Sequence, residues 1–210
     1  MSTEQAQNSY LIPSQQQSAE QNIRKSRFIC TIAHAPSRDA ANRFIQKIKK
    51  EHSRANHSCS AFICGRPDDP TGWGMNDDGE PKGSAGKPMF NVLQHSGIGE
   101  ICAVVTRYFG GIKLGTGGLA RAYSSSVLLV LPNLDLIAKV EYTEINLTLP
   151  YHLHKTIEIL LTKEACRIVA TDFTDNIVIH AELPTQNKQN ILLQLQRFHH
   201  QGLILTVPSK

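Results

Sequence analysis

The chain has 210 residues, of which 40% are hydrophobic and 19% charged, and its formal net charge is +4. These proportions are ordinary for a globular protein. No apolar run approaches the roughly 18–20 residues that span a bilayer, and the first residues, MSTEQAQNSYLIP, lack the basic start and apolar core of a secretory signal. A spanning helix and a secretory leader are therefore not predicted, and we expect a cytoplasmic protein without membrane association.

The first half of the chain is predicted to mix strands and helices around one long loop. Residues 1–20 are polar and rich in Gln and Ser, so a flexible N-terminal tail is expected. Ser37 is placed to cap a helix whose apolar residues share one face. Strands are predicted at 25–34, 57–65 and 100–109, and helices at 37–52, at 89–97 and from the hinge to about 131. The glycine- and proline-rich stretch 66–88 has no periodicity, and loops of that length are usually functional or mobile.

The second half has a more regular pattern. Residues 132–139, PNLDLIAK, are predicted to be a linker. After it come a strand, a helix, two strands, a helix and a strand, at 140–150, 152–164, 166–173, 176–183, 186–200 and 203–207. This β-α-β-β-α-β order is the ferredoxin-like plan. We therefore predict one domain over 21–131 and a second over 140–210.

The charge is unevenly distributed between these halves. From Ile23 to Leu131 there are 15 Lys and Arg against 8 Asp and Glu, whereas from Val140 to Lys210 there are 6 against 7. A basic first half favours a polyanionic partner, although a solvated basic surface explains it equally well. The five cysteines are an odd number, and Cys30, Cys64 and Cys102 lie in apolar strings, which is typical of buried free thiols in a reducing compartment.

The stretch 104–123, VVTRYFGGIKLGTGGLARAY, joins a predicted strand to a predicted helix. It contains five glycines, the three cations Arg107, Lys113 and Arg121, and no acidic residue. Glycines let backbone N–H groups approach a ligand, and a helix start carries partial positive charge. The stretch is therefore predicted to cradle an anion. The alternative is that the glycines only permit a tight turn and close strand–helix packing.

Two nucleotide-binding motifs match this region in part and are rejected. Residues 115–120 fit G-x-G-x-x-A, but GGIKL separates them from the strand, and no acid-terminated strand follows the helix. In GSAGKPM, Pro88 occupies the position where a P-loop requires Ser or Thr. No cofactor is therefore predicted.

A second candidate is the acidic turn of the long loop. Asp77, Asp78 and Glu80 could hold Mg²⁺ or act as a carboxylate pair, but their spacing fits no EF-hand, and a solvated turn is the simpler interpretation. His57 and Cys59 share a strand face, which allows a catalytic pair but is more often simple packing. The single tryptophan, Trp73, could stack on a base or anchor the loop. We predict no catalytic residue and no metal.

Two long motifs, DDGEPKGSAGKPM and AVVTRYFGGIKLGTGGLARAY, resemble the signature of the IMPACT/YigZ family, over nearly the whole chain from about residue 22. Ser84 departs from the expected Thr. The resemblance implies an N-terminal two-layer domain of the ribosomal-protein and elongation-factor domain-four type, with helices on one face of a sheet, and a ferredoxin-like C-terminal domain, which is the α+β class. Eukaryotic relatives regulate translation through an extra N-terminal domain, and this chain has only a short tail there. The family supplies no catalytic residues.

From the basic first half, the hinge and the resemblance, we predict a translation-associated protein that binds RNA or the ribosome and is regulatory rather than catalytic. The residues predicted to bind phosphate are Lys82, Lys87, Arg107, Tyr108, Lys113, Gly115, Gly117, Gly118 and Arg121. The alternative is a hydrolase or other enzyme that acts on a small phosphorylated or peptide substrate through the Asp77, Asp78 and Glu80 loop. The sequence leaves the oligomeric state open.

Overall fold

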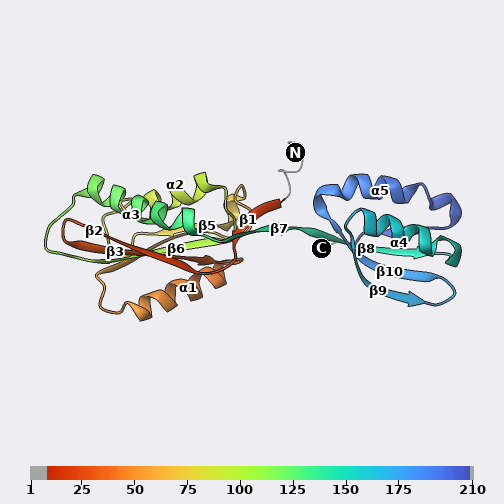
Figure 1. Cartoon of the computed structure of the whole chain (residues 1–210), viewed down its shortest axis with the longest axis horizontal. Helices are drawn as coiled ribbons and strands as arrows, with labels where there is room; N and C mark the ends of the chain where they lie inside the picture. Colours follow the sequence, from red (N-terminus) through yellow and green to blue (C-terminus); the bar gives the residue numbers. More distant parts are fainter. Residues whose placement is uncertain (1–8, 209–210) are drawn as a thin grey trace. The chain divides into compact units, whose positions relative to one another are not determined.

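The computed structural model describes residues 9–208, and these fold into two compact units. The first unit spans Tyr10–Lys139, and the second comprises residues 140–208 together with Ser9. Figure 1 labels most of the helices and strands of both units. Each unit combines helices with a sheet, so the predicted α+β class is confirmed. Among the helices of residues 9–208, none is long and apolar enough to cross a bilayer.

The first unit contains a five-stranded sheet, a separate strand pair and three helices. Its strands are β1 (Ser9–Pro13), β2 (Gln17–Ile23), β3 (Ser26–His34), β4 (His57–Ile63), β5 (Trp73–Asn76), β6 (Ile101–Tyr108) and β7 (Leu136–Val140). Its helices are α1 (Arg38–Glu51), α2 (Gly86–Ser96) and α3 (Thr116–Val130). The sheet has the order β2-β3-β6-β4-β5, and every neighbouring pair in it is antiparallel. Consequently β6, the last of these five strands in the chain, lies at the centre of the sheet.

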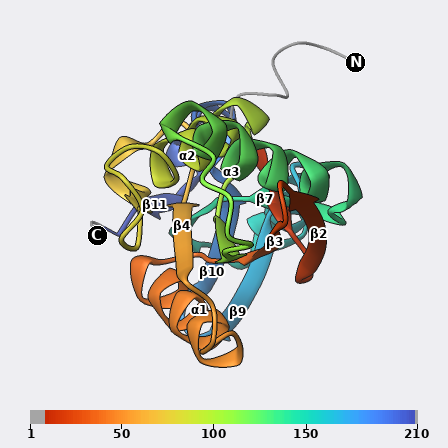
Figure 2. The same cartoon turned by 90° about the vertical axis from the view of Figure 1, so that its left-hand side faces the viewer.

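Helices cover both faces of this sheet. On one face α1 packs through Ala41, Phe44, Ile45 and Ile48, and Ser37 caps it as predicted. Figure 2 shows α1 on one side of β4, with α2 and α3 on the other. The resemblance implied helices on one face only, in two layers, so this detail is corrected to three layers.

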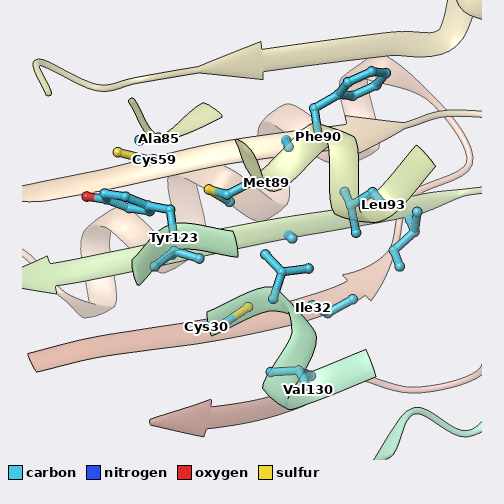
Figure 3. Packing of buried hydrophobic residues seen from close by; sticks show 14 of the residues in the cluster. Cys30, Ile32, Cys59, Ala85, Met89, Phe90, Leu93, Tyr123 and Val130 are labelled. Carbon is cyan, nitrogen blue, oxygen red and sulfur yellow. The ribbon is translucent and has the colours of Figure 1, made fainter. Parts of the chain in front are cut away.

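The third layer follows from strands that are buried on both sides. Along β4, Cys59, Ala61 and Ile63 pack toward α2 and α3, whereas Phe62 packs toward α1. Ser58 and Ser60 share the α1 face with Phe62 and are buried as well, so both faces of the strand are covered. The α2–α3 side holds the larger core. Figure 3 shows Met89 and Leu93 of α2 and Tyr123 of α3 in that core.

The prediction of a flexible tail over residues 1–20 is corrected, because residues 9–13 and 17–23 form β1 and β2. The first eight residues lie outside the described part of the chain. β2 is polar in sequence because it is an edge strand in which every second residue is exposed. The side-chain amide of Gln21 holds it to α3 by donating hydrogen bonds to the hydroxyls of Ser125 and Ser126, at 2.8 and 2.7 Å.

The predicted linker, 132–139, also has regular structure. β7 occupies its second half and pairs with β1. The backbone N–H of Ser14 extends this contact by donating to the carbonyl of Asp135 at 2.9 Å. The segment therefore belongs to the first unit rather than lying free between two domains.

The second unit has the predicted ferredoxin-like plan. Its elements are β8 (Tyr142–Leu149), α4 (His154–Lys163), β9 (Arg167–Phe173), β10 (Ile177–Pro184), α5 (Lys188–Gln196) and β11 (Ile204–Thr206). The strand order is β11-β8-β10-β9, and all three pairs are antiparallel. Figure 1 shows α4 and α5 on the same side of this sheet. Alternate residues of β8 and β10, such as Leu147 and Ile179, join Ile157 and Leu195 of the helices in one core.

Candidate nucleic-acid interface

The glycine-rich hinge lies between β6 and α3, as the sequence predicts. β6 ends at Tyr108, α3 begins at Thr116, and Gly115 is the N-cap residue. No side chain of residues 9–208 caps this helix end, and its first turn contains no acidic residue. The N–H groups of a first helical turn have no acceptor within the helix and carry the positive end of its dipole. The hinge can therefore donate backbone hydrogen bonds to an anion.

The three glycines at this helix end differ in what the fold requires. Gly115 has a φ of 73°, a left-handed conformation that other residues rarely adopt. A Cβ added to Gly118 would lie 3.1 Å from the Cβ of Leu114, a tight contact. Gly117 has no left-handed φ, and a Cβ built there meets no atom of the described chain within 4 Å. The packing alternative therefore explains Gly115 and Gly118 but not Gly117.

Arg107 is not the exposed phosphate ligand that was predicted from the sequence. It is only 5% exposed, and its Nη1 donates to Oε1 of Glu80 at 2.6 Å. The hydroxyl of Tyr123 donates to the same oxygen at 2.8 Å. The guanidinium lies 5.5 Å from the ring centre of Phe28 and 5.3 Å from that of Phe109. Arg107 points into the unit because it shares a strand face with core residues of β6.

Tyr108 and Phe109 take different sides of the sheet. The hydroxyl of Tyr108 lies 3.0 Å from Nδ1 of His52, beyond the end of α1, and Arg27 covers its ring at 4.9 Å. Tyr108 therefore lies on the α1 side, away from the hinge cavity described below, and its predicted phosphate-site role is corrected. Phe109 follows in the hinge and is 44% exposed. It is the aromatic residue that a ligand at the hinge can contact.

The acidic turn is engaged in internal contacts. Asp77 accepts hydrogen bonds from the backbone N–H groups of Gly83, Ala85 and Gly86 at 2.7–3.0 Å. Asp78 accepts from the backbone N–H of Ser58 at 2.6 Å and pairs with Lys49 at 2.5 Å. Glu80 is bound as described above. The three carboxylates on which the enzyme alternative was based thus have structural roles. In residues 9–208 no cluster of His, Cys, Asp and Glu is arranged to hold a metal.

The protonation of this region agrees with a structural role. Partial burial raises the pKa of Asp77, but the three backbone donors lower it by more, so it lies below its usual range. Burial is the main cause that raises the pKa of Cys59 to about 12, and its Sγ donates to the carbonyl of Asp77 at 2.9 Å. His57 holds the same turn through Nδ1, 2.8 Å from the carbonyl of Asp78. Cys59 is therefore a protonated thiol, and these contacts give His57 and Cys59 a structural role.

Trp73 anchors the long loop, which is one of the two roles predicted for it; the other was stacking on a base. Its ring lies 5.0 Å from that of Phe90 in α2, and it packs against the main core. The long loop is therefore held at Trp73 and at Asp77, and its exposed residues lie between fixed points.

Four predicted cations differ in their surroundings. Lys82, Lys113 and Arg121 are exposed, and no carboxylate of the described residues pairs with them. Lys87, in the first turn of α2, is also exposed, with its Nζ 5.4 Å from the ring centre of Phe90. The absence of acidic partners leaves the charge of the first three available to an anion.

Three segments converge at the hinge end of the sheet. The backbone N–H of Phe109 donates to Oδ1 of Asn56 at 2.8 Å, which joins the hinge to the segment before β4. The backbone N–H of Gly110 donates to the hydroxyl of Ser26 at 3.2 Å, which joins it to the β2–β3 turn. These segments are far apart in sequence, so only the fold places their charges together.

Three cations in these segments were not predicted from the sequence. Arg24 and Lys25 form the β2–β3 turn, with φ of 44° and 67°, and Arg54 precedes Asn56. All three are exposed, and no carboxylate among residues 9–208 pairs with them. The basic pair at 24–25 was a usable signal, but β2 was assigned to a tail, so no turn was expected.

A cavity of about 450 Å³ opens at the hinge. Its lining includes Arg107 and Phe109, the start of α3, and two residues at the start of β4, Asn56 just before the strand and His57 within it. A second cavity, of about 400 Å³, is lined by Arg24 and Arg121. Leu114 lines both cavities, so the two adjoin at the hinge loop. We call the exposed cations Arg24, Lys25, Arg54, Lys82, Lys113 and Arg121 the basic rim.

The fold and the hinge together define a class: a two-domain α+β protein whose first domain carries a basic, glycine-rich strand-to-helix hinge and whose second domain is ferredoxin-like. Residues 24–131 match the family model of the Impact N-terminal domain. The chain is 41% identical over 197 residues to the IMPACT family member YigZ of Escherichia coli, a match that covers 94% of this chain and 97% of that protein. The chain therefore belongs to the IMPACT family, and the resemblance is confirmed.

Other relatives agree. An IMPACT family member of Haemophilus influenzae is 44% identical over 168 residues, which is 80% of this chain and 82% of the relative. A crystal structure described as a hypothetical protein is 39% identical, with a TM-score of 0.71, and the match covers 97% of this chain and 98% of that one. The similarity thus extends over both units.

Proposed function

We propose that this cytoplasmic protein binds RNA, free or within the ribosome, through the hinge end of its first unit. It acts on translation by binding rather than by catalysis. One observation carries the proposal: the six exposed cations of the basic rim lie on segments that the fold brings to the hinge or its cavity, which also holds the uncapped start of α3. Phosphate oxygens are the ligands that such cations and helix N-termini recognise.

The neutralised carboxylates make this end of the unit more favourable to a polyanion. Glu80, the acidic residue that lines the hinge cavity, is paired with Arg107 inside the fold. Asp78 is paired with Lys49. The rim therefore attracts phosphate without an exposed acidic group in the cavity to oppose it, and such a field accelerates association with RNA.

The test removes three rim cations, Arg24→Ala, Lys113→Ala and Arg121→Ala. Affinity for a single-stranded RNA should fall, and the slope of log affinity against log salt should decrease by about 0.7 for each phosphate that the variant no longer neutralises. The melting temperature should change little, since exposed substitutions cost within about 0.5 kcal/mol each. Co-sedimentation with ribosomes at low salt should weaken in parallel.

A matched control removes the same charge from the second unit. Lys155, Lys163 and Arg197 are exposed there. Their triple alanine variant should keep the salt slope of the unmodified protein. Equal decreases in both variants would show that net charge, not the rim, drives binding, and an unchanged slope in the rim variant would refute the proposal.

A further inference from the structure

The hinge cavity contains a buried polar group that the fold leaves unsatisfied. The side chain of Arg107, which lines the cavity, is 7% exposed, and its Nη1 is used by Glu80. Its Nε has no hydrogen-bond partner among the described residues. A buried donor without an acceptor is costly and rare in folded proteins. Because the Arg107 side chain lines the cavity, a ligand there lies beside a charge network that the fold leaves incompletely satisfied.

The neighbouring strand presents further hydrogen-bonding groups at this cavity. Nδ1 of His57 faces the carbonyl of Asp78 and therefore carries the ring proton, which leaves Nε2 as an acceptor in the neutral ring. Oδ1 of Asn56 accepts from the hinge backbone, which leaves its Nδ2 as a donor. Donors and acceptors side by side in one wall suit the edge of a heteroaromatic base.

A nucleotide also needs an apolar surface for its base and an anion site for its phosphate. The hinge supplies both. Phe109 lines the cavity and is 44% exposed, and Arg107 lies 5.3 Å from its ring centre, so the exposed part of the ring can contact a base. Lys113 and the uncapped start of α3 lie at the same cavity. Gly117 leaves open space in the first turn of that helix although packing and φ do not require glycine. Open space beside free N–H groups allows a phosphate to approach.

We propose that the hinge cavity receives one nucleotide of a single strand, with the base against Phe109 and the phosphate at Lys113 and the start of α3. Its volume of about 450 Å³ lies within the range of about 300–1,000 Å³ that is typical of small-molecule sites. This inference rests on the proposed RNA-binding function and specifies it: the protein prefers unpaired RNA, because a duplex must release a base before it can fill the cavity.

The test compares Phe109→Leu, which keeps an apolar side chain, with Phe109→Tyr, which keeps the ring. The probes are a short single-stranded RNA, a duplex of the same length, the four nucleoside 5′-monophosphates and inorganic phosphate. Phe109→Leu should weaken single-strand affinity roughly tenfold to a hundredfold, the range that corresponds to the stacking of one base on an aromatic ring. Duplex affinity and the salt slope should not change, and Phe109→Tyr should bind like the unmodified protein. Gly117→Ala should weaken monophosphate binding without loss of stability.

The outcomes separate the cavity from the rim. Equal effects of Phe109→Leu on single strand and duplex, or no effect, would overturn the nucleotide cavity while leaving RNA binding by the rim intact. Inorganic phosphate that binds as tightly as the monophosphates would also overturn it, because no base would then be recognised. Monophosphate binding that depends on Phe109, without any RNA binding, would support the cavity and refute the proposed function.

Discussion

The two units of this chain differ in where they place glycine and buried polarity. Thirteen of the fourteen glycines lie in the first unit, and Gly202 is the single one in the second. Of the described residues, the ten polar or charged ones that are buried all belong to the first unit as well. The second unit is built from alternating strands and amphipathic helices around an aliphatic core.

This difference indicates that the first unit must meet a functional requirement in addition to stability. Glycine and buried charge both destabilise a fold unless a local geometry or a partner requires them. Five of the first unit's glycines lie in the hinge, and Arg107, Glu80 and Tyr123 form a buried network at its cavity. A second buried charge, Glu100, lies before the other end of β6 and is bound by Tyr10, His34 and Lys139. Departures from simple folding rules are typical of functional sites, and the hinge is the place where they coincide with a cavity.

The largest expected effect comes from breaking that network. Glu80→Ala leaves Arg107 as a buried charge without its partner, which typically costs about 3–5 kcal/mol. Denaturant unfolding followed by the fluorescence of Trp73, the single tryptophan, reports on the first unit, where that residue lies. The urea concentration at the midpoint of unfolding should therefore be lower for Glu80→Ala than for the unmodified protein.

Two variants sharpen this result. Glu182→Ala breaks the ion pair with Arg167 in the second unit. Nη1 of Arg167 lies 3.9 Å from Oε2 of Glu182, and the Arg167 side chain is exposed, so the loss of this pair should cost less than about 1 kcal/mol of stability. The double variant Glu80→Met with Arg107→Met should recover most of the stability, because an apolar pair can replace a buried ion pair. If the double variant is as unstable as Glu80→Ala, the charge was not the cause.

A smaller effect is expected from the thiols at alkaline pH. Burial raises the pKa of Cys30, Cys59 and Cys102 above the ordinary value of 9.0. Because the folded-state pKa is the higher one, each thiol stabilises the fold fully below pH 9, and that contribution is lost as pH rises toward the folded-state value. The decrease is about 1.4 kcal/mol per thiol for each pH unit.

Unfolding curves from pH 7 to above pH 10 measure this slope. Cys30→Ala should make the decline above about pH 9 shallower, by the share of one thiol. Cys166, in the second unit, has a pKa raised to about 11 mainly by burial, so its contribution to the slope, which Cys166→Ala removes, should end near pH 11, whereas that of Cys30 should continue to higher pH in curves extended above pH 11. Equal slopes in all three proteins would show that other groups control alkaline unfolding.

The smallest effect distinguishes two glycines. Gly117→Ala should raise stability by up to about 1 kcal/mol, since alanine favours the helix and nothing in the described chain opposes its Cβ. Gly202→Ala in the second unit should lower stability by about 1 kcal/mol, because its φ is 95° and the new Cβ would lie 3.0 Å from Pro150. Thermal melts of both variants measure the contrast, and destabilisation by Gly117→Ala would mean that packing requires that glycine.

Much of the second unit could be predicted from the sequence, because its residues alternate with the period of their elements. Leu153, Ile157 and Leu161, for example, recur at helical spacing and are buried together. The hinge was also predictable, since glycines between an apolar strand and an apolar helix leave few other conformations. The cations of the rim near the hinge, such as Lys113 and Arg121, followed from it.

The partners of buried charges could not be predicted in the same way. Glu80 and Arg107 are 27 residues apart, and only the packing of α2 and α3 on the sheet brings them together. The strand pattern did contain one signal: Arg107 follows Ala103 and Val105 at a spacing of two, so it shares their buried face. β2 was missed because only Ala19 and Ile23 of its residues are apolar, and much of its contact with α3 is made by the amide of Gln21.

The central position of β6 has a consequence for synthesis of the chain on the ribosome. While residues up to about 100 emerge, the hairpin of β2 and β3 and the hairpin of β4 and β5 can each pair internally, but they share no edge with one another. β6 pairs with β3 on one side and β4 on the other, so its arrival joins the two hairpins. The hinge is the next segment to emerge, and a nascent chain therefore completes its sheet only as it begins to make the site that the sheet supports.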